Sequence, residues 1–211
     1  MRPARDWSLY LVTDRDLAGG RPLLDVVAAA VRGGVTAVQL REKTCSTREF
    51  VELGRALQPM LSEATVPLII NDRVDVAMAI GAEGVHLGQS DMDAVTARSL
   101  LGADAIIGLS VETMDQALAA ESLDVDYLGV GPIFATPTKA DAAAPWGLAQ
   151  LAKLRAASRH ILVAIGGIGT DNAAGVRQAG ADGIAVVSAI CAAPDVERAT
   201  RELSMSVCPR G

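Results

Sequence analysis

The chain has 211 residues, 50% of them hydrophobic but only 3% aromatic, and its formal net charge is −6. A chain of this length can bury one substantial core, which we expect to consist mainly of aliphatic side chains. The acidic balance argues against nucleic-acid binding, because such proteins normally present a basic face. The longest uncharged run, 183–194, is shorter than the ~20 residues of a membrane helix, so we expect no membrane association.

Three cysteines, Cys45, Cys191 and Cys208, show no CxxC spacing. An odd number of such cysteines is typical of reduced intracellular thiols and not of a disulfide framework or a zinc site. The first residues contain no apolar signal core. We therefore expect a soluble cytoplasmic protein, with the choice between a monomer and a homo-oligomer left open.

Eight short apolar runs alternate with eight helical patterns along the chain. The predicted strands span 9–13, 37–40, 68–70, 84–87, 106–109, 127–130, 161–165 and 183–187. The predicted helices span 22–32, 47–63, 73–80, 92–101, 113–122, 147–157, 171–179 and 195–205.

Four segments share one order of features: a helix end, a glycine at the C′ position and the start of a strand. They are 30–40, 79–87, 100–110 and 178–186. Such a repeat indicates stacked βα units. We predict a single-domain α/β fold over 1–211, a (β/α)8 TIM barrel. An open doubly wound sheet is the alternative, although no GxGxxG motif follows the first strand.

Two carboxylates follow neighbouring predicted strands. Asp72 lies just past the third strand and Asp91 just past the fourth. Because the two strands of a strand–helix–strand crossover are parallel, both carboxylates should emerge at the same edge of the sheet. Mg²⁺ usually takes one or two carboxylates and completes its shell with water and substrate phosphate. The pair therefore predicts a magnesium site.

Cationic residues follow other strands at the same edge. Arg41 and Lys43 come after the second strand, and Lys139 ends the loop 131–139. Arg can grip a phosphate with two parallel hydrogen bonds, and Lys acts as a point charge. Arg41 or Lys43 taken alone could equally be a solvated loop charge. Thr136 and Thr138 add hydroxyl donors, although an ordinary turn could have the same composition.

Glycines follow the seventh predicted strand, at Gly166, Gly167 and Gly169, and Ser188 follows the eighth. This is the usual phosphate-binding position in such barrels, although glycine-rich turns also occur for steric reasons alone. Two anion sites and one metal suggest two substrates, one with a pyrophosphate and one with a monophosphate.

The chain has two histidines, neither predicted to be a catalytic base. His86 lies within a strand and reads as a core or supporting residue, and His160 precedes the seventh strand at the wrong edge. Catalysis should then depend on metal and electrostatic stabilisation of a leaving group.

Eight segments lie in order at the predicted strands: YLVTDR, VQLREK, IINDR, GVHLGQSD, GLSV, GVGPIFATPTK, AIGGI and VVSAI. Together they resemble the thiamin phosphate synthase (thiamin-phosphate pyrophosphorylase) family over nearly the whole chain. The resemblance implies a (β/α)8 barrel. It also implies a Mg²⁺-dependent transferase that joins hydroxymethylpyrimidine pyrophosphate to hydroxyethylthiazole phosphate, giving thiamin phosphate and pyrophosphate. In that family the pyrophosphate departs first, and the thiazole nitrogen attacks the resulting cation.

The resemblance also implies roles for single residues. The pyrimidine pyrophosphate would contact Gln39, Arg41, Lys43, Asn71, Ser110 and Lys139, of which Lys139, Ser110 and Arg41 would be catalytic. The thiazole phosphate would contact Thr136, Pro137, Thr138, Gly166, Gly167, Val187 and Ser188. Asp72 and Asp91 would bind Mg²⁺.

Two positions depart from the family pattern. Ala135 replaces a proline, and Glu112, which we expect in the first turn of the next helix, replaces a histidine. Two other functions stay open. One is a related thiazole tautomerase, which uses a histidine after the sixth strand, where this chain has Pro132. The other is a non-catalytic paralogue that binds thiamin intermediates and regulates through a partner.

Overall fold

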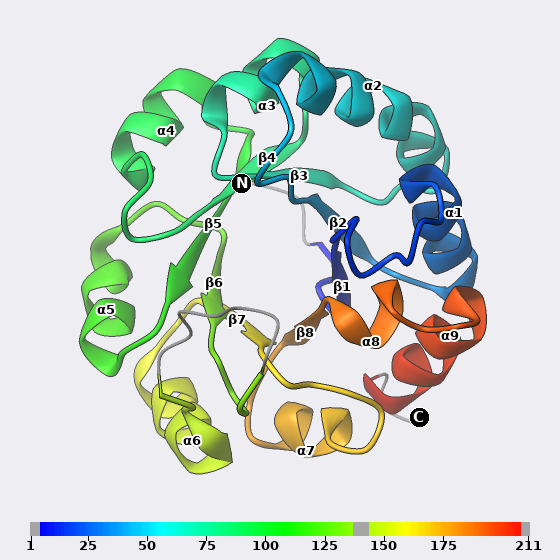
Figure 1. The fold of residues 1–211 in the computed structure, drawn as a ribbon. Coiled ribbons are helices and arrows are strands. Elements are labelled where there is room, and N and C mark those ends of the chain that lie inside the picture. The colour runs from blue at the N-terminus through cyan, green and yellow to red at the C-terminus, as the bar shows by residue number, and fades with distance from the viewer. Residues whose placement is uncertain (1–4, 137–143, 208–211) are drawn as a thin grey trace.

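Eight parallel strands close into a barrel in chain order, with β1 paired to both β2 and β8 (Figure 1). The computed structural model describes residues 5–136 and 144–207. The strands are β1 (Leu9–Val12), β2 (Ala37–Leu40), β3 (Leu68–Asn71), β4 (Gly84–Leu87), β5 (Ile106–Val111), β6 (Tyr127–Val130), β7 (Ile161–Ile165) and β8 (Gly183–Val186). The closed order confirms the predicted (β/α)8 barrel and excludes the open sheet.

The helices form a ring outside the strands (Figure 1). They are α1 (Leu23–Gly33), α2 (Thr47–Glu63), α3 (Val74–Ile80), α4 (Ala94–Leu101), α5 (Met114–Ala119), α6 (Gly147–Ala157), α7 (Ala173–Gln178), α8 (Ser188–Cys191) and α9 (Val196–Val207), with a 3₁₀ turn η1 (Ala120–Ser122) after α5. The short α8 was not predicted, because four residues are too few to show a helical period.

The predicted glycine turns are present. Gly34, Gly81, Gly102 and Gly180 all have positive φ, between 66° and 105°. At Gly34 and Gly81 the chain adopts the left-handed conformation directly after the helix. Glycine reaches this conformation without the penalty that a Cβ would impose. The repeated glycine thus ends a helix and turns the chain back toward the next strand.

Buried side chains form two layers. The larger layer lies between the strands and the helices, and the smaller one fills the barrel interior. In the interior the rings of Trp7, Tyr10 and Tyr127 pack together, with centroids 4.4 to 5.8 Å apart. Because Trp7 precedes β1, this aromatic group fills the amino-terminal part of the barrel and leaves space toward the carboxyl ends of the strands.

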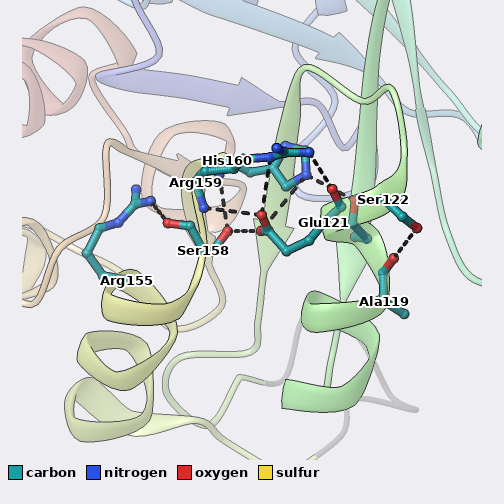
Figure 2. A network of polar contacts seen from close by, with 8 residues as sticks. Ala119, Glu121, Ser122, Arg155, Ser158, Arg159 and His160 are labelled. Atoms are coloured by element: carbon teal, nitrogen blue, oxygen red, sulfur yellow. Dashed lines mark hydrogen bonds and ion pairs between the residues drawn. The ribbon is translucent and has the colours of Figure 1, made fainter.

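A polar network fastens the amino-terminal end of β7 (Figure 2). Ser158 Oγ donates to Glu121 Oε1 at 2.5 Å, and Arg159 Nη2 donates to the backbone oxygen of Glu121 at 2.6 Å. His160 Nε2 lies 3.0 Å from Ala120 O. The network joins η1 to the segment before β7 and places His160 away from the carboxyl ends of the strands, as predicted. Among the described residues, no helix has the length and hydropathy needed to cross a membrane.

Candidate active site

A cavity of about 650 Å³ opens at the carboxyl ends of the strands, and every strand contributes to its lining. Its walls combine charged residues at the rim with hydroxyl, amide and imidazole groups further inside. The lining includes Tyr10, Gln39, Arg41, Lys43, Asn71, Asp72, His86, Asp91, Ser110, Glu112, Tyr127, Thr136, Gly166, Gly167, Val187 and Ser188.

Asp72 stands at a sharp turn directly after β3. Its φ is +61°, a left-handed conformation that few residues other than glycine, Asn and Asp adopt. Its backbone N–H donates to His86 O at 2.8 Å, which ties the turn to β4. The turn aims the Asp72 carboxylate at Lys43, whose Nζ lies 2.6 Å from Asp72 Oδ2. A strained backbone at such a position is typical of functional sites.

Asp91 lies beside Asp72 in the turn after β4. Its Oδ2 accepts a hydrogen bond from the backbone N–H of Gly88 at 2.7 Å. Burial raises the pKa of the Asp91 carboxyl, and the nearby Asp72 raises it further, while the Gly88 hydrogen bond and Lys43 lower it. The two carboxylates therefore repel each other across a narrow space.

The loop after β1 holds the loop after β2 in place. Thr13 Oγ accepts from the backbone N–H of Arg41 at 3.0 Å, and Arg41 Nη1 lies 3.6 Å from Asp14 Oδ2. One position further, Arg15 Nη2 lies 2.6 Å from Glu42 Oε2. Burial raises the pKa of Glu42, whereas the hydrogen bond and charge of Arg15 lower it. The pairs Arg15–Glu42 and Asp14–Arg41 thus join the two loops, and Glu42 lies in the chain between Arg41 and Lys43, which line the cavity.

A chain of polar side chains crosses the barrel interior. Gln39 Nε2 donates to the Tyr10 hydroxyl at 3.1 Å, and the hydroxyls of Tyr10 and Tyr127 lie 2.9 Å apart. The Tyr127 hydroxyl lies 2.9 Å from His86 Nδ1, and His86 Nε2 lies 2.8 Å from Ser110 Oγ. Burial lowers the pKa of His86 to about 4, against a small opposing effect of Asp72. His86 is therefore neutral at physiological pH.

The rim after β7 is a glycine turn. Gly166 and Gly167 have φ of +100° and +65°, and a Cβ on either would approach the segment after β6 within 2.6 to 2.8 Å. The backbone of Ile133 and Phe134 hydrogen-bonds to this turn, which brings the loop after β6 against it. The N–H of Gly169, however, donates to Asn172 Oδ1 at 2.9 Å. The first two glycines therefore face the cavity, and the third is engaged by α7.

The family model described as thiamine monophosphate synthase matches residues 9–190. The chain belongs to the thiamine monophosphate synthase family.

Close relatives carry the same name. A thiamine-phosphate synthase of Albidiferax ferrireducens is 60% identical over 187 residues, which is 89% of this chain and 85% of the relative. One of Syntrophomonas wolfei is 54% identical over 198 residues, covering 94% of this chain and 95% of the relative. The solved structure of a thiamine phosphate pyrophosphorylase from Pyrococcus furiosus superposes with a TM-score of 0.89 at 42% identity, covering 96% of both chains. These matches confirm the resemblance inferred from the motifs.

The structure brings most of the predicted residues of this thiamine monophosphate synthase family member to one cavity. Gln39, Arg41, Lys43, Asn71, Asp72, Asp91, Ser110, Thr136, Gly166, Gly167, Val187 and Ser188 all line it. Pro137, Thr138 and Lys139 lie outside the described residues. The expected position of Glu112 was wrong, because α5 is capped by Thr113 and Glu112 precedes the cap.

Sequence reasoning missed Tyr10 and Tyr127 as cavity residues. Both lie inside strands, where an aromatic side chain is indistinguishable from ordinary core. One signal was available, because they are the only two tyrosines of the chain, Tyr10 begins the motif YLVTDR and Tyr127 lies two residues before GVGPIFATPTK. His86 lies within β4, as predicted, and hydrogen-bonds through both ring nitrogens.

Asp72 and Asp91, the pair that the sequence predicts as magnesium ligands, both line the cavity. Among residues 5–136 and 144–207, no group of three or more His, Cys, Asp or Glu could hold a metal ion. A pair of carboxylates is nevertheless the donor set that Mg²⁺ uses when phosphate oxygens and water supply the other ligands. Burial and, after it, the neighbouring Asp72 raise the pKa of Asp91, and a divalent cation between the two carboxylates would oppose both effects.

Proposed function

We propose that this chain is a thiamin phosphate synthase that condenses hydroxymethylpyrimidine pyrophosphate with hydroxyethylthiazole phosphate. Membership of the thiamine monophosphate synthase family and the similarity to two proteins named thiamine-phosphate synthase support this reaction. The geometry that carries the proposal is the convergence of Asp72, Asp91 and Lys43 on one wall of the cavity. Carboxylates beside a cation suit a site where a metal-bound pyrophosphate leaves.

The proposed roles divide the cavity into three parts. Asp72 and Asp91 would hold Mg²⁺, which would supply positive charge beside the leaving pyrophosphate. Gln39, Arg41, Lys43, Asn71, Ser110 and Lys139 bind the pyrimidine pyrophosphate, with Arg41, Ser110 and Lys139 assisting its departure. Thr136, Pro137, Thr138, Gly166, Gly167, Val187 and Ser188 bind the thiazole phosphate.

The residues explain why the reaction needs no strong base. His86 is neutral and engaged at both ring nitrogens, and the attacking thiazole nitrogen carries no proton. The protein therefore acts by orientation and by stabilising charge on the leaving group. The buried aromatic end of the cavity excludes water from the cationic pyrimidine that remains after pyrophosphate leaves.

The thiazole tautomerase is the closest alternative function. That reaction moves a proton within one substrate and needs a base, and a histidine after the sixth strand serves it in the related branch. Here the described part of that loop, 131–136, contains no histidine. The pair of Asp72 and Asp91 also has no use in such an isomerisation, which favours the synthase.

Pyrophosphate release from the purified protein tests the proposal. Release should require both substrates and Mg²⁺ together, and should stop with excess chelator and resume when Mg²⁺ is restored. Release from the pyrimidine alone would indicate a hydrolase instead. No release under any condition, with both substrates bound, would assign the chain to a non-catalytic binding protein.

A further inference from the structure

The interior hydrogen-bond chain joins two residues on opposite sides of the cavity. Gln39 on β2 and Ser110 on β5 are its ends, and Tyr10, Tyr127 and His86 are its links. The exposed fractions of Gln39, Tyr10 and Tyr127 are 4%, 1% and 0%. Three of its five members are therefore shielded from bulk water, whereas His86 and Ser110 are half-buried.

Glycines inside the barrel leave space for this chain of hydrogen bonds. His86 and Tyr127 stand on β4 and β6, and both are paired with Gly108 on the strand between them. A methyl group at Gly108 would overlap the Tyr127 ring and hydroxyl and also His86 Nδ1. A methyl at Gly129 would approach His86 Cε1 to 2.8 Å. Two glycines thus leave room for the link between His86 and Tyr127.

The direction of every link follows from the first one. Because the Gln39 amide donates to Tyr10, the Tyr10 hydroxyl is free to donate to Tyr127, and Tyr127 to His86 Nδ1. The neutral imidazole has one donor and one acceptor nitrogen. Its Nε2–H must then donate to Ser110 Oγ, which leaves the Ser110 hydroxyl hydrogen for an acceptor in the cavity.

All the hydrogen bonds of this series can also run in the opposite direction, and every donor then still has an acceptor. If Gln39 turns its amide over, its oxygen accepts from Tyr10 and each following link reverses, so that Ser110 donates to His86. A reversal part-way would set two donors or two acceptors against each other at one buried link, which is unfavourable. The chain is therefore a two-state element whose ends change together.

We infer that this chain couples recognition of the pyrimidine ring edge by Gln39 to hydrogen-bond donation by Ser110 toward the leaving pyrophosphate. Tyr10, Tyr127 and His86 are positioning residues in this scheme. The inference rests on the proposed function. An amino group on the ring edge needs the Gln39 oxygen in the cavity, which is the state that makes Ser110 a donor. A carbonyl at the same ring position needs the Gln39 N–H there, which reverses the chain and turns a lone pair of Ser110 toward the pyrophosphate.

The ring nitrogens of His86 report the state of the chain directly. Nitrogen NMR of the full-length protein distinguishes the Nε2–H tautomer of His86 from the Nδ1–H tautomer. The substitution His160→Gln removes the signal of the other histidine. We expect the Nε2–H tautomer in the free protein. It should persist with 4-amino-5-hydroxymethyl-2-methylpyrimidine and convert to Nδ1–H with the 4-oxo counterpart.

Tyr10→Phe is the matched variant, because it cuts the chain next to Gln39 and leaves the contacts of His86 intact. It should abolish the tautomer response to the 4-oxo compound. In turnover with the two pyrophosphates it should lower the preference for the amino substrate about tenfold, the effect of one hydrogen bond. Binding of both pyrimidines to the wild type without a tautomer change would overturn the coupling alone. Failure of both to bind would overturn it together with the assignment of the pyrimidine site.

Discussion

Lys43 Nζ lies 2.6 Å from Asp72 Oδ2, whereas Asp91 beside it has its closest described partner in a backbone N–H, that of Gly88. The two carboxylates are therefore unequal. The ammonium group compensates Asp72, and burial next to Asp72 raises the pKa of Asp91. A carboxyl whose pKa is raised in the folded state opposes folding when it is ionised, and Asp91 is expected to do so.

Asp91→Asn should therefore raise the melting temperature and remove Mg²⁺-dependent turnover. A carboxyl whose pKa is raised by folding destabilises the native state above that pKa, and the effect disappears below the unfolded value near 3.8. We expect a gain of about 1 to 3 °C at pH 8 without metal, and no gain near pH 3.5. Added Mg²⁺ should stabilise the wild type but not the variant.

Asp93→Ala is the control for this measurement. Asp93 lies two residues away and caps α4, with Oδ1 accepting from Thr96 N at 2.9 Å. Loss of the cap should lower the melting temperature by a few degrees and leave the Mg²⁺ requirement unchanged. An Asp91→Asn variant that turns over normally would remove Asp91 from the proposed metal site.

Glu42→Gln should impair binding of the pyrimidine pyrophosphate, although Glu42 itself is not among the residues proposed to contact this substrate. The buried Glu42 carboxylate holds Arg15 at 2.6 Å, and it lies between Arg41 and Lys43 in the chain. Loss of a hydrogen bond to a charged group costs about 1.5 to 3 kcal/mol, which corresponds to about tenfold or more in affinity. We expect kcat/KM to fall about tenfold for the pyrimidine pyrophosphate, mainly through KM, with the KM of the thiazole phosphate unchanged.

Glu49→Gln provides a control on the same arginine. Glu49 Oε1 lies 2.7 Å from Arg15, but its side chain is 47% exposed, against 4% for Glu42. Exposed ion pairs contribute little, so this variant should keep nearly full activity. Equal losses in the two variants would show that Arg15 itself matters and that Glu42 does not position the loop.

The sequence was sufficient to predict the barrel and most of the cavity rim because both depend on local signals. A glycine after a helix and apolar runs of four or five residues mark the βα units. Asp72 and Asp91 lie in the turns after β3 and β4. The interior chain depends instead on the register of β4, β5 and β6, which places His86 opposite Gly108 and Gly108 opposite Tyr127. Pairing register between strands is a property of the folded sheet, so the link from Tyr127 to His86 could not be read from the motifs.

Glu121→Gln should destabilise the fold without affecting catalysis. Burial raises the pKa of Glu121, but hydrogen bonds from Ser158 and Arg159 and the charges of His160 and Arg159 outweigh it, so the pKa is lowered overall. A carboxyl with a lowered pKa stabilises the native state at neutral pH, and this contribution is lost as pH falls below about 4.5. We expect a loss of about 1 kcal/mol at pH 7, a smaller loss at pH 4, and unchanged kcat/KM.

Glu202→Gln is a suitable comparison for that variant, because Glu202 is 59% exposed and pairs with Arg198 only at 3.9 Å. It should show no resolvable change in denaturant midpoint at either pH. A loss of turnover in Glu121→Gln, with stability intact, would contradict a purely structural role for the network in Figure 2.

Gly108→Ala should damage the interior chain, and Gly175→Ala should not. A methyl at Gly108 overlaps Tyr127 and His86, so one of them must move, at a cost of about 1 to 3 kcal/mol. At Gly175 in α7 the nearest atom is Leu148 Cδ1 at an ordinary 3.6 Å, and alanine in a helix should stabilise by about 0.5 to 1 kcal/mol. Urea unfolding gives both values, and kcat should fall only in Gly108→Ala. A Gly108→Ala protein with wild-type stability and turnover would show that the contact between Tyr127 and His86 is dispensable.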